Sequence, residues 1–82
     1  MAYRADLAVQ VDEALMGLSD DDRQEVMELI AEALVDPNSW PAPDGWTWAL
    51  RAGPRMWMVF TADLDGIDVL AIGEIDVALH AA

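Results

Sequence analysis

Apolar positions recur with helical spacing in the first part of the chain. Between Asp6 and Leu18 they lie four, three, one and three residues apart, which is the spacing of one face of an α-helix. The sequence therefore predicts an amphipathic helix over residues 6–18. The predicted buried face consists of Leu7, Val11, Ala14, Leu15 and Leu18.

A second helix is predicted to begin after Ser19 and to end at Asp36. Ser19 is a favourable N-cap, and the three aspartates that follow it lie at the positive end of the helix dipole. Pro37 ends the helix because the residue before a proline is pushed out of the α region. The predicted buried face consists of Val26, Leu29, Ile30, Ala33 and Leu34.

Three glutamates share an exposed face of this second helix. Glu25, Glu28 and Glu32 are three and four residues apart, so their side chains lie one above the other. Each like-charge pair at this spacing costs a few tenths of a kcal/mol. The repulsion within this row is therefore either tolerated or serves a function.

The second half of the chain has the pattern of a β-sheet. Residues 37–45 hold three prolines and an Asp-Gly pair, which indicates a loop, and strands are predicted over 46–51, 55–62 and 67–75. The second of these strands is apolar on both faces, as is typical of a central strand. In the third, Ile67, Val69 and Ala71 alternate with Asp68, Leu70 and Ile72.

These elements predict one α+β domain over residues 1–82. We expect an N-terminal helical hairpin packed on a small, mainly antiparallel sheet of three to four strands. A two-layer domain of this kind has helices for one sheet face only. One apolar face of the central strand is therefore expected to lack cover from the chain itself.

The charge balance restricts the partners. Sixteen acidic residues oppose four arginines, there is no lysine, and the formal net charge is -12. Nucleic-acid affinity depends on Lys and Arg that neutralise phosphates, so the composition disfavours direct nucleic-acid binding. The acidic surplus serves solubility, or it makes the protein a nucleic-acid mimic or an inhibitor that binds a basic protein.

The sequence offers no conventional metal or cofactor site. It has no cysteine and a single histidine, His80, so neither a thiolate site nor a histidine-rich zinc site is expected, and we predict no cofactor. No apolar run is long enough to span a bilayer, and the first residues lack the apolar region of a signal peptide. A cytoplasmic protein without membrane contact is expected.

Three stretches carry a resemblance to a known family. "LMGLSDDDRQEVMELIAEALVDP" is similar to the helical hairpin, and "LRAGPRMWMVF" followed by "DLDGIDVLAIGEI" to the central hairpin, of the RelE/ParE superfamily of bacterial type II toxins. The resemblance implies a short N-terminal strand, here Ala2 to Arg4. It also implies a protein partner, because toxins of this family are commonly wrapped by antitoxins.

The resemblance also names candidate catalytic residues. RNA-cleaving members use basic residues on the sheet to cut mRNA on the ribosome, without a metal. By this resemblance Arg55 would stabilise the negative charge that develops on the scissile phosphate, Arg51 would be a second basic residue, and His80 would serve in acid–base chemistry.

Several positions depart from the family pattern. Thr47 and Ala49 stand where the family often has lysine, and Glu74, Ile75 and Asp76 replace basic residues after the third strand. The basic site is therefore expected to be degenerate. We expect Arg51 to be an exposed strand charge and Arg55 to pair with a carboxylate of the 63–76 region, namely Asp63, Asp65 or Asp76.

Aromatic and methionine residues indicate a protein-binding surface. All four tryptophans lie between residues 40 and 57, and Trp and Met are enriched in protein interfaces. An antitoxin-like segment, or a second copy in a homodimer, would cover the free sheet face. The candidate partner-binding residues are Trp46, Trp48, Met56, Trp57 and Met58.

Three functions follow from these observations. The first is a toxin-like protein of the RelE/ParE fold that acts mainly through protein–protein contacts, with a degenerate basic site. The second is a ribosome-dependent mRNA endoribonuclease that uses Arg51, Arg55 and His80. The third is an acidic decoy that occupies a nucleic-acid-binding protein.

Overall fold

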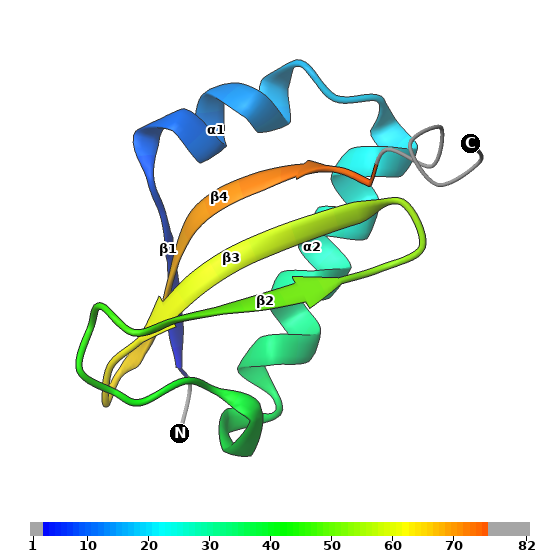
Figure 1. Cartoon of the computed structure of the whole chain (residues 1–82). Coiled ribbons are helices and arrows are strands. Elements are labelled where there is room, and N and C mark those ends of the chain that lie inside the picture. Colours follow the sequence, from blue (N-terminus) through cyan, green and yellow to red (C-terminus); the bar gives the residue numbers. More distant parts are fainter. Residues whose placement is uncertain (1–2, 76–82) are drawn as a thin grey trace, which may run out of the picture.

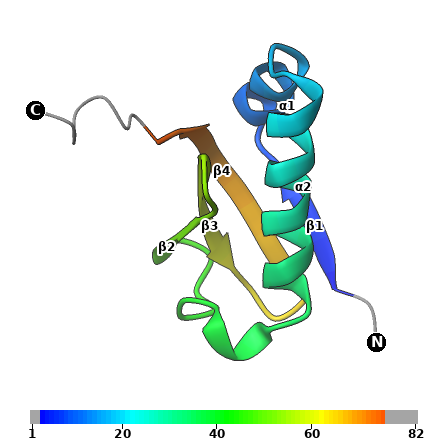
Figure 2. The ribbon, with the colours of Figure 1, turned by 90° about the vertical axis from the view of Figure 1, so that its right-hand side faces the viewer.

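In the computed structural model, two helices lie on one face of a four-stranded sheet, and residues 3–75 are described (Figures 1 and 2). The helices are α1 (Val9–Met16) and α2 (Asp20–Leu34), followed by the 3-10 turn η1 (Pro37–Ser39). The strands are β1 (Arg4–Leu7), β2 (Trp48–Ala52), β3 (Met56–Ala62) and β4 (Gly66–Glu74). The predicted α+β architecture is confirmed.

The sheet is mainly antiparallel. Its order is β1-β4-β3-β2, so the three-stranded meander predicted from the sequence is extended by β1. β1 pairs with β4 in parallel, and the other pairs are antiparallel. β2 therefore lies at one edge of the sheet.

The first predicted helix is wrong at its N-terminal end. Asp6 and Leu7 belong to β1, and the helix begins at Val9. The four-residue spacing from Leu7 to Val11 fits a helical face, but Arg4–Leu7 also alternates between exposed and half-buried residues, which suits a strand. Pairing with β4 decides between these periods, and it shifts the expected strand from residues 2–4 to Arg4–Leu7.

The second helix begins as predicted. The hydroxyl of Ser19 accepts a hydrogen bond from the backbone N–H of Asp22 (3.2 Å), so it is the N-cap. The helix ends at Leu34, slightly before Asp36, and η1 begins at Pro37. Its apolar face packs on β3.

The core lies between the helices and the central strands. Helix residues Val11, Leu15, Val26, Leu29, Ile30 and Ala33 pack against strand residues Met56, Met58, Phe60, Ala62, Ile67 and Val69. Both strand methionines have no exposed surface. One face of β3 is thus entirely core.

A β-bulge changes which residues of β4 face the core. The register shifts between Val59 and Phe60 of β3, so Val69 pairs with Phe60 while Ala71 pairs with Val59. Cross-strand partners share a sheet face, which places Ala71 on the face away from the helices. Ile72 pairs with Met58 and packs against the core. The predicted alternation of β4 is therefore wrong beyond Val69.

Candidate partner-binding surface

The sheet face opposite the helices carries an apolar groove. Trp48 and Leu50 of β2 are 64% and 61% exposed, which is high for large apolar side chains. No helix of the described residues 3–75 lies on this face (Figure 2). The groove has a volume of about 480 Å³ and is lined by Trp48, Leu50, Ala52, Trp57, Val59 and Ile75.

The floor of this apolar groove is fixed by a tryptophan that lies on a glycine. Trp57 pairs with Gly73 across β3 and β4. A Cβ atom added at Gly73 would lie 2.4 Å from Cζ2 of the indole, so the ring occupies the space that a side chain would need. The missing side chain of Gly73 therefore leaves room for the Trp57 ring against the backbone of β4.

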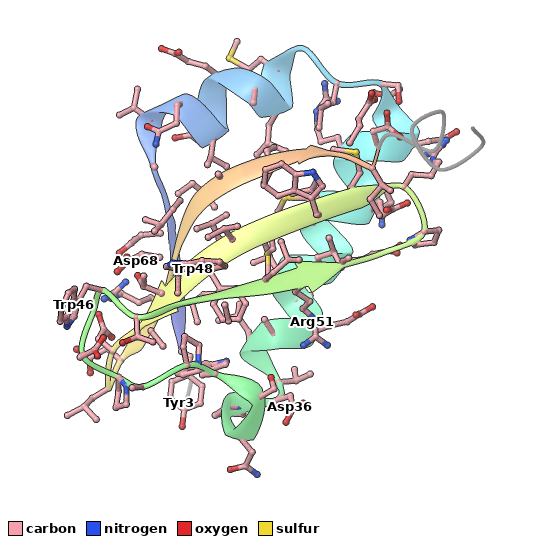
Figure 3. All side chains as sticks on the ribbon, viewed as in Figure 1. Tyr3, Asp36, Trp46, Trp48, Arg51 and Asp68 are labelled. Carbon is pink, nitrogen blue, oxygen red and sulfur yellow. The ribbon has the colours of Figure 1, made fainter. Side chains whose placement is uncertain are left out.

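The predicted partner-binding residues separate into three groups. Trp48 and Trp57 both line the groove. Trp46 is 78% exposed, but it lies in the loop before β2, outside the groove (Figure 3). The prediction is wrong for Met56 and Met58, because alternation along β3 directs their side chains into the core, where neither has exposed surface.

Asp44 holds the start of the hairpin in place. Its carboxylate accepts hydrogen bonds from the Thr47 hydroxyl (2.5 Å) and from the backbone N–H groups of Thr47 (2.7 Å) and Trp46 (2.9 Å). These bonds favour the ionised form and lower the pKa of Asp44, the Thr47 hydroxyl having the largest effect. These hydrogen bonds fix the backbone just before β2 begins.

Arg51 is not the exposed strand charge that we expected. Its guanidinium lies 3.5 Å from the carboxylate of Glu32 on α2, and its side chain is 28% exposed. Alternation along β2 places Arg51 on the side of the sheet that faces the helices, away from the groove (Figure 3). The predicted catalytic arginine is thus used to join β2 to α2.

Arg55 is paired, but its partners are not those that we predicted. The guanidinium contacts Asp22 (2.8 Å) and Glu25 (3.7 Å), both in α2, and not Asp63 or Asp65. The β2–β3 turn lies beside the first half of α2, whereas the β3–β4 turn lies at the other end of the strands, which explains the difference (Figure 1). Asp76, the third partner that we predicted, and His80 both lie outside the described residues.

Glu25 is a site residue that the sequence did not reveal. Its carboxylate accepts hydrogen bonds from the backbone N–H groups of Arg55 (2.8 Å) and Met56 (2.5 Å), and its side chain is only 13% exposed. It therefore clamps the β2–β3 turn to α2. The row of three glutamates in the sequence indicated that this helix face could have a role. Their spacing alone does not predict which of them contacts the β2–β3 turn.

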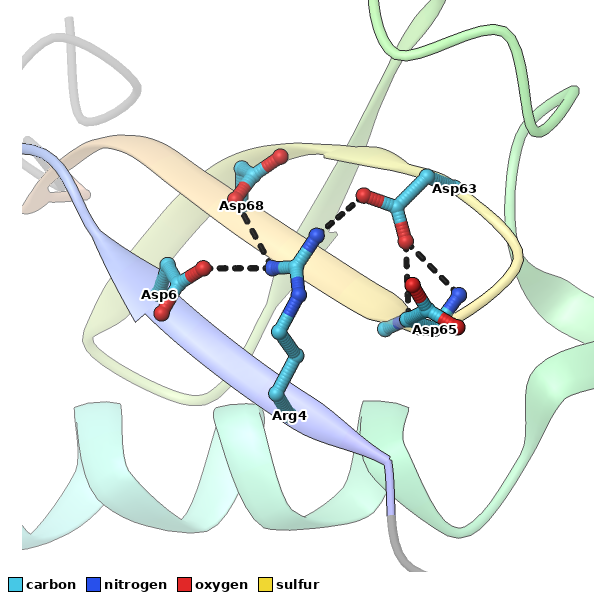
Figure 4. A network of polar contacts seen from close by, with 6 residues as sticks. Arg4, Asp6, Asp63, Asp65 and Asp68 are labelled. Atoms are coloured by element: carbon cyan, nitrogen blue, oxygen red, sulfur yellow. Dashed lines mark hydrogen bonds and ion pairs between the residues drawn. The ribbon is translucent and has the colours of Figure 1, made fainter.

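Arg4 lies in β1, at the edge of the sheet opposite β2, and is surrounded by aspartates (Figure 4). Its guanidinium donates hydrogen bonds to Asp6 (2.5 Å), Asp68 (3.1 Å) and Asp63. Desolvation lowers the pKa of Arg4, but the hydrogen bond to Asp68 and the charges of Asp63 and Asp6 outweigh it, so the pKa lies above its ordinary value. Three carboxylates around one arginine leave this region negative.

The remaining arginine joins the two helices. Arg23 donates hydrogen bonds to the backbone carbonyls of Leu15 (3.1 Å) and Leu18 (3.1 Å), and it pairs with Asp20 (3.0 Å). Each of the four arginines thus contacts at least one carboxylate. None of them lines the apolar groove.

We expect Arg55→Ala to lower the free energy of unfolding by about 1 kcal/mol. The Arg55 side chain is 56% exposed, so its ion pairs are partly screened, while Asp22 and Glu25 are nearly buried and would lose their counter-charge. Urea unfolding followed by circular dichroism measures the loss. Unchanged stability would show that the arginine does not serve the fold.

Comparison with known proteins places the fold. The chain is similar in structure to the toxin RelE of E. coli, solved in the free state as a mutant with two arginines replaced by alanine, with a TM-score of 0.72 and 14% sequence identity. The match covers 96% of this chain and 90% of the RelE chain. The protein therefore has a RelE-like fold. No protein-family model matches the sequence, and neither does any curated protein.

Two further properties concern residues 3–75. None of the helices there is both long enough and apolar enough to cross a membrane. No three acidic or histidine side chains within this range come together in a group that could hold a metal ion.

Proposed function

We propose that this chain is a toxin-like protein of the RelE/ParE fold that acts in the cytoplasm mainly through protein–protein contacts, with a degenerate basic site. The observation that supports this most strongly is the use of its arginines. Arg51 is paired with Glu32 and Arg55 with Asp22 and Glu25, so the cations that the resemblance assigns to phosphate chemistry are already neutralised.

Electrostatics argue against a phosphate at Arg55. A small cavity beside it is lined by Arg55, Asp22, Glu74 and Ile75, so two carboxylates border the space that a phosphate would enter. Stabilising the charge of a phosphoryl transition state requires donors and cations that are free to face it. The alternative of a ribosome-dependent endoribonuclease needs Arg55 to leave its partners, and it also relies on His80.

The groove supports an action through protein contacts. Large exposed apolar side chains gathered on one face are uncommon in proteins that work alone, and a groove lined by two tryptophans, Trp48 and Trp57, has the composition of an interface core. An antitoxin-like segment is the partner that the fold suggests. The second alternative, an acidic decoy for a basic protein, draws on the same surplus of carboxylates but does not use the groove.

Expression in bacteria, with growth and mRNA integrity followed together, tests this function. We expect mRNA to stay intact, and we expect a growth effect to be relieved by Trp48→Ala but kept by Arg55→Ala, because the groove and not the arginine makes the contact. Arg51→Ala serves as a second control for the nuclease alternative. Degradation of mRNA that Arg55→Ala abolishes, in a variant that still folds, would make the endoribonuclease the correct function.

A further inference from the structure

The edge of β2 has free backbone groups beside its exposed side chains. The Gly53 N–H donates to the Met56 carbonyl (2.8 Å), which makes this a hydrogen-bonded pair of the antiparallel ladder. Because such pairs alternate along a ladder, the N–H and C=O groups of Trp48, Leu50 and Ala52 point away from β3. The residues that line the groove from β2 are thus the same ones that offer unpaired backbone groups.

This edge lacks the usual protection against added strands. β2 contains no lysine, no proline and no bulge, which are the features that commonly prevent edge pairing. Its arginine, Arg51, is directed toward α2 and is held by Glu32. An extended segment can therefore approach β2 without meeting a repelling side chain on the groove side.

A row of carboxylates on α2 passes close to the same edge. Glu25 holds the β2–β3 turn and Glu32 pairs with Arg51, so the row begins at this turn and meets β2 again where the helix crosses behind the strand. Glu28 stands between them, exposed and without an ion pair among the described residues, and its carboxylate accepts a hydrogen bond from Gln24. Figure 1 shows the C-terminal part of α2 passing behind β2 and beyond it.

We propose that the partner-binding surface takes a cationic, amphipathic segment of a protein partner that adds to the edge of β2 as a further strand. A new strand would lie about 4.8 Å from β2, with its side chains pointing alternately to the two faces of the sheet. One set of its side chains lies over the groove beside Leu50 and is apolar. The other set faces Glu28 and Glu32 and is lysine or arginine. This inference rests on the proposed function and names its partner chemistry.

Charge decides between this partner and a second copy of the chain. The far side of the groove is also acidic, because Trp48 pairs with Thr61 and Thr61 with Asp68, which lies in the aspartate cluster around Arg4. Edge-to-edge pairing of two copies would bring two chains of net charge -12 together along their glutamate rows. Only a basic segment meets acidic side chains favourably here.

A synthetic peptide of alternating valine and lysine, as long as β2, tests the inference. Binding to the purified chain is followed by tryptophan fluorescence, since Trp48 and Trp57 line the groove. We expect saturable binding that weakens as salt is added, because the charges are exposed. A peptide of alternating valine and glutamate, and a valine–lysine peptide with N-methylated backbone, are expected not to bind.

Matched variants locate the site. Leu50→Asp should abolish binding, whereas Leu64→Asp, which changes an even more exposed leucine outside the groove, should not. Glu28→Gln should weaken binding about two- to fivefold, as for one exposed ion pair. Glu13→Gln, an exposed carboxylate on α1, should leave binding unchanged.

The outcomes are separable. No binding of the valine–lysine peptide at millimolar concentration, or equal binding of the valine–glutamate peptide, would overturn the inference. So would sedimentation of the chain alone as a dimer that Leu50→Asp converts to a monomer, because a second copy would then be the occupant. These results concern only the partner of the groove, so the proposed function would still stand. Cleavage of mRNA in the expression experiment would instead overturn the proposed function.

Discussion

Gly66→Ala is expected to lower the free energy of unfolding by about 3 kcal/mol. A Cβ atom at Gly66 would lie 2.0 Å from the backbone carbonyl oxygen of Arg4 in the neighbouring strand. Backbone cannot move aside as a flexible side chain does, so β1 must shift away from β4. The hydrogen bonds from Arg4 N–H to Asp65 (3.1 Å) and from Ala8 N–H to Val69 (3.0 Å) would be weakened with it.

Hydrogen exchange and thermal unfolding measure this effect. The amides of β1 should lose protection before those of β3, and the melting temperature should fall by about 4–8 °C for each kcal/mol. Gly17→Ala is the matched control, because its Cβ would lie at an ordinary 3.7 Å from Ala14. If both variants melt alike, the close approach of β1 to Gly66 is not what holds this edge.

Glu25→Ala is expected to cost about 2–3 kcal/mol. The substitution removes a nearly buried carboxylate that accepts two backbone N–H groups, those of Arg55 and Met56. Those donors would be left without a partner, and Arg55 would lose one of its two counter-charges. The loss should exceed that of Arg55→Ala, because Glu25 also serves the backbone of the turn.

Glu28→Ala provides the control on the same face of the helix. Glu28 is exposed and makes no ion pair in the described part of the chain, so its removal should change stability by no more than about 0.5 kcal/mol. Glu25→Gln should fall between the two, since the amide oxygen still accepts a hydrogen bond but carries no charge. Equal effects of Glu25→Ala and Glu28→Ala would contradict the clamp.

The start of the second helix and the central strand could be predicted from short stretches of sequence. Ser19 with the aspartates after it marked the start of α2, and the apolar run after Arg55 marked the central strand. Both depend on capping or periodicity within a short window. The lack of helices on one face followed from the count of elements, since two helices cover only one side of a small sheet.

The errors arose where distant residues decide the structure. Leu7 fits a helical stripe, yet pairing with Val69 makes it part of a strand, and a bulge beside Phe60 reverses the faces of Ala71 and Ile72. The local sequence alone decides neither the pairing of β1 with β4 nor the position of the bulge.

The same limit applies to the site. Arg55 was expected to pair with a carboxylate of the 63–76 region, but the fold brings α2 closer, and Glu25 was missed for that reason. Residue type was also insufficient at Met56 and Met58, because strand alternation and not composition buries them. Trp48 and Trp57 do line the groove on the uncovered face, and their part in partner binding stays a prediction.

The most direct test of the central claim, that the arginines serve the fold and not RNA cleavage, is to add the purified protein to translating ribosomes and map mRNA ends by primer extension. We predict no new ends, even with protein in excess over ribosomes, because Arg51 and Arg55 are already neutralised by carboxylates of α2. New mRNA ends that disappear with Arg55→Ala, in a variant shown to be folded, would contradict it.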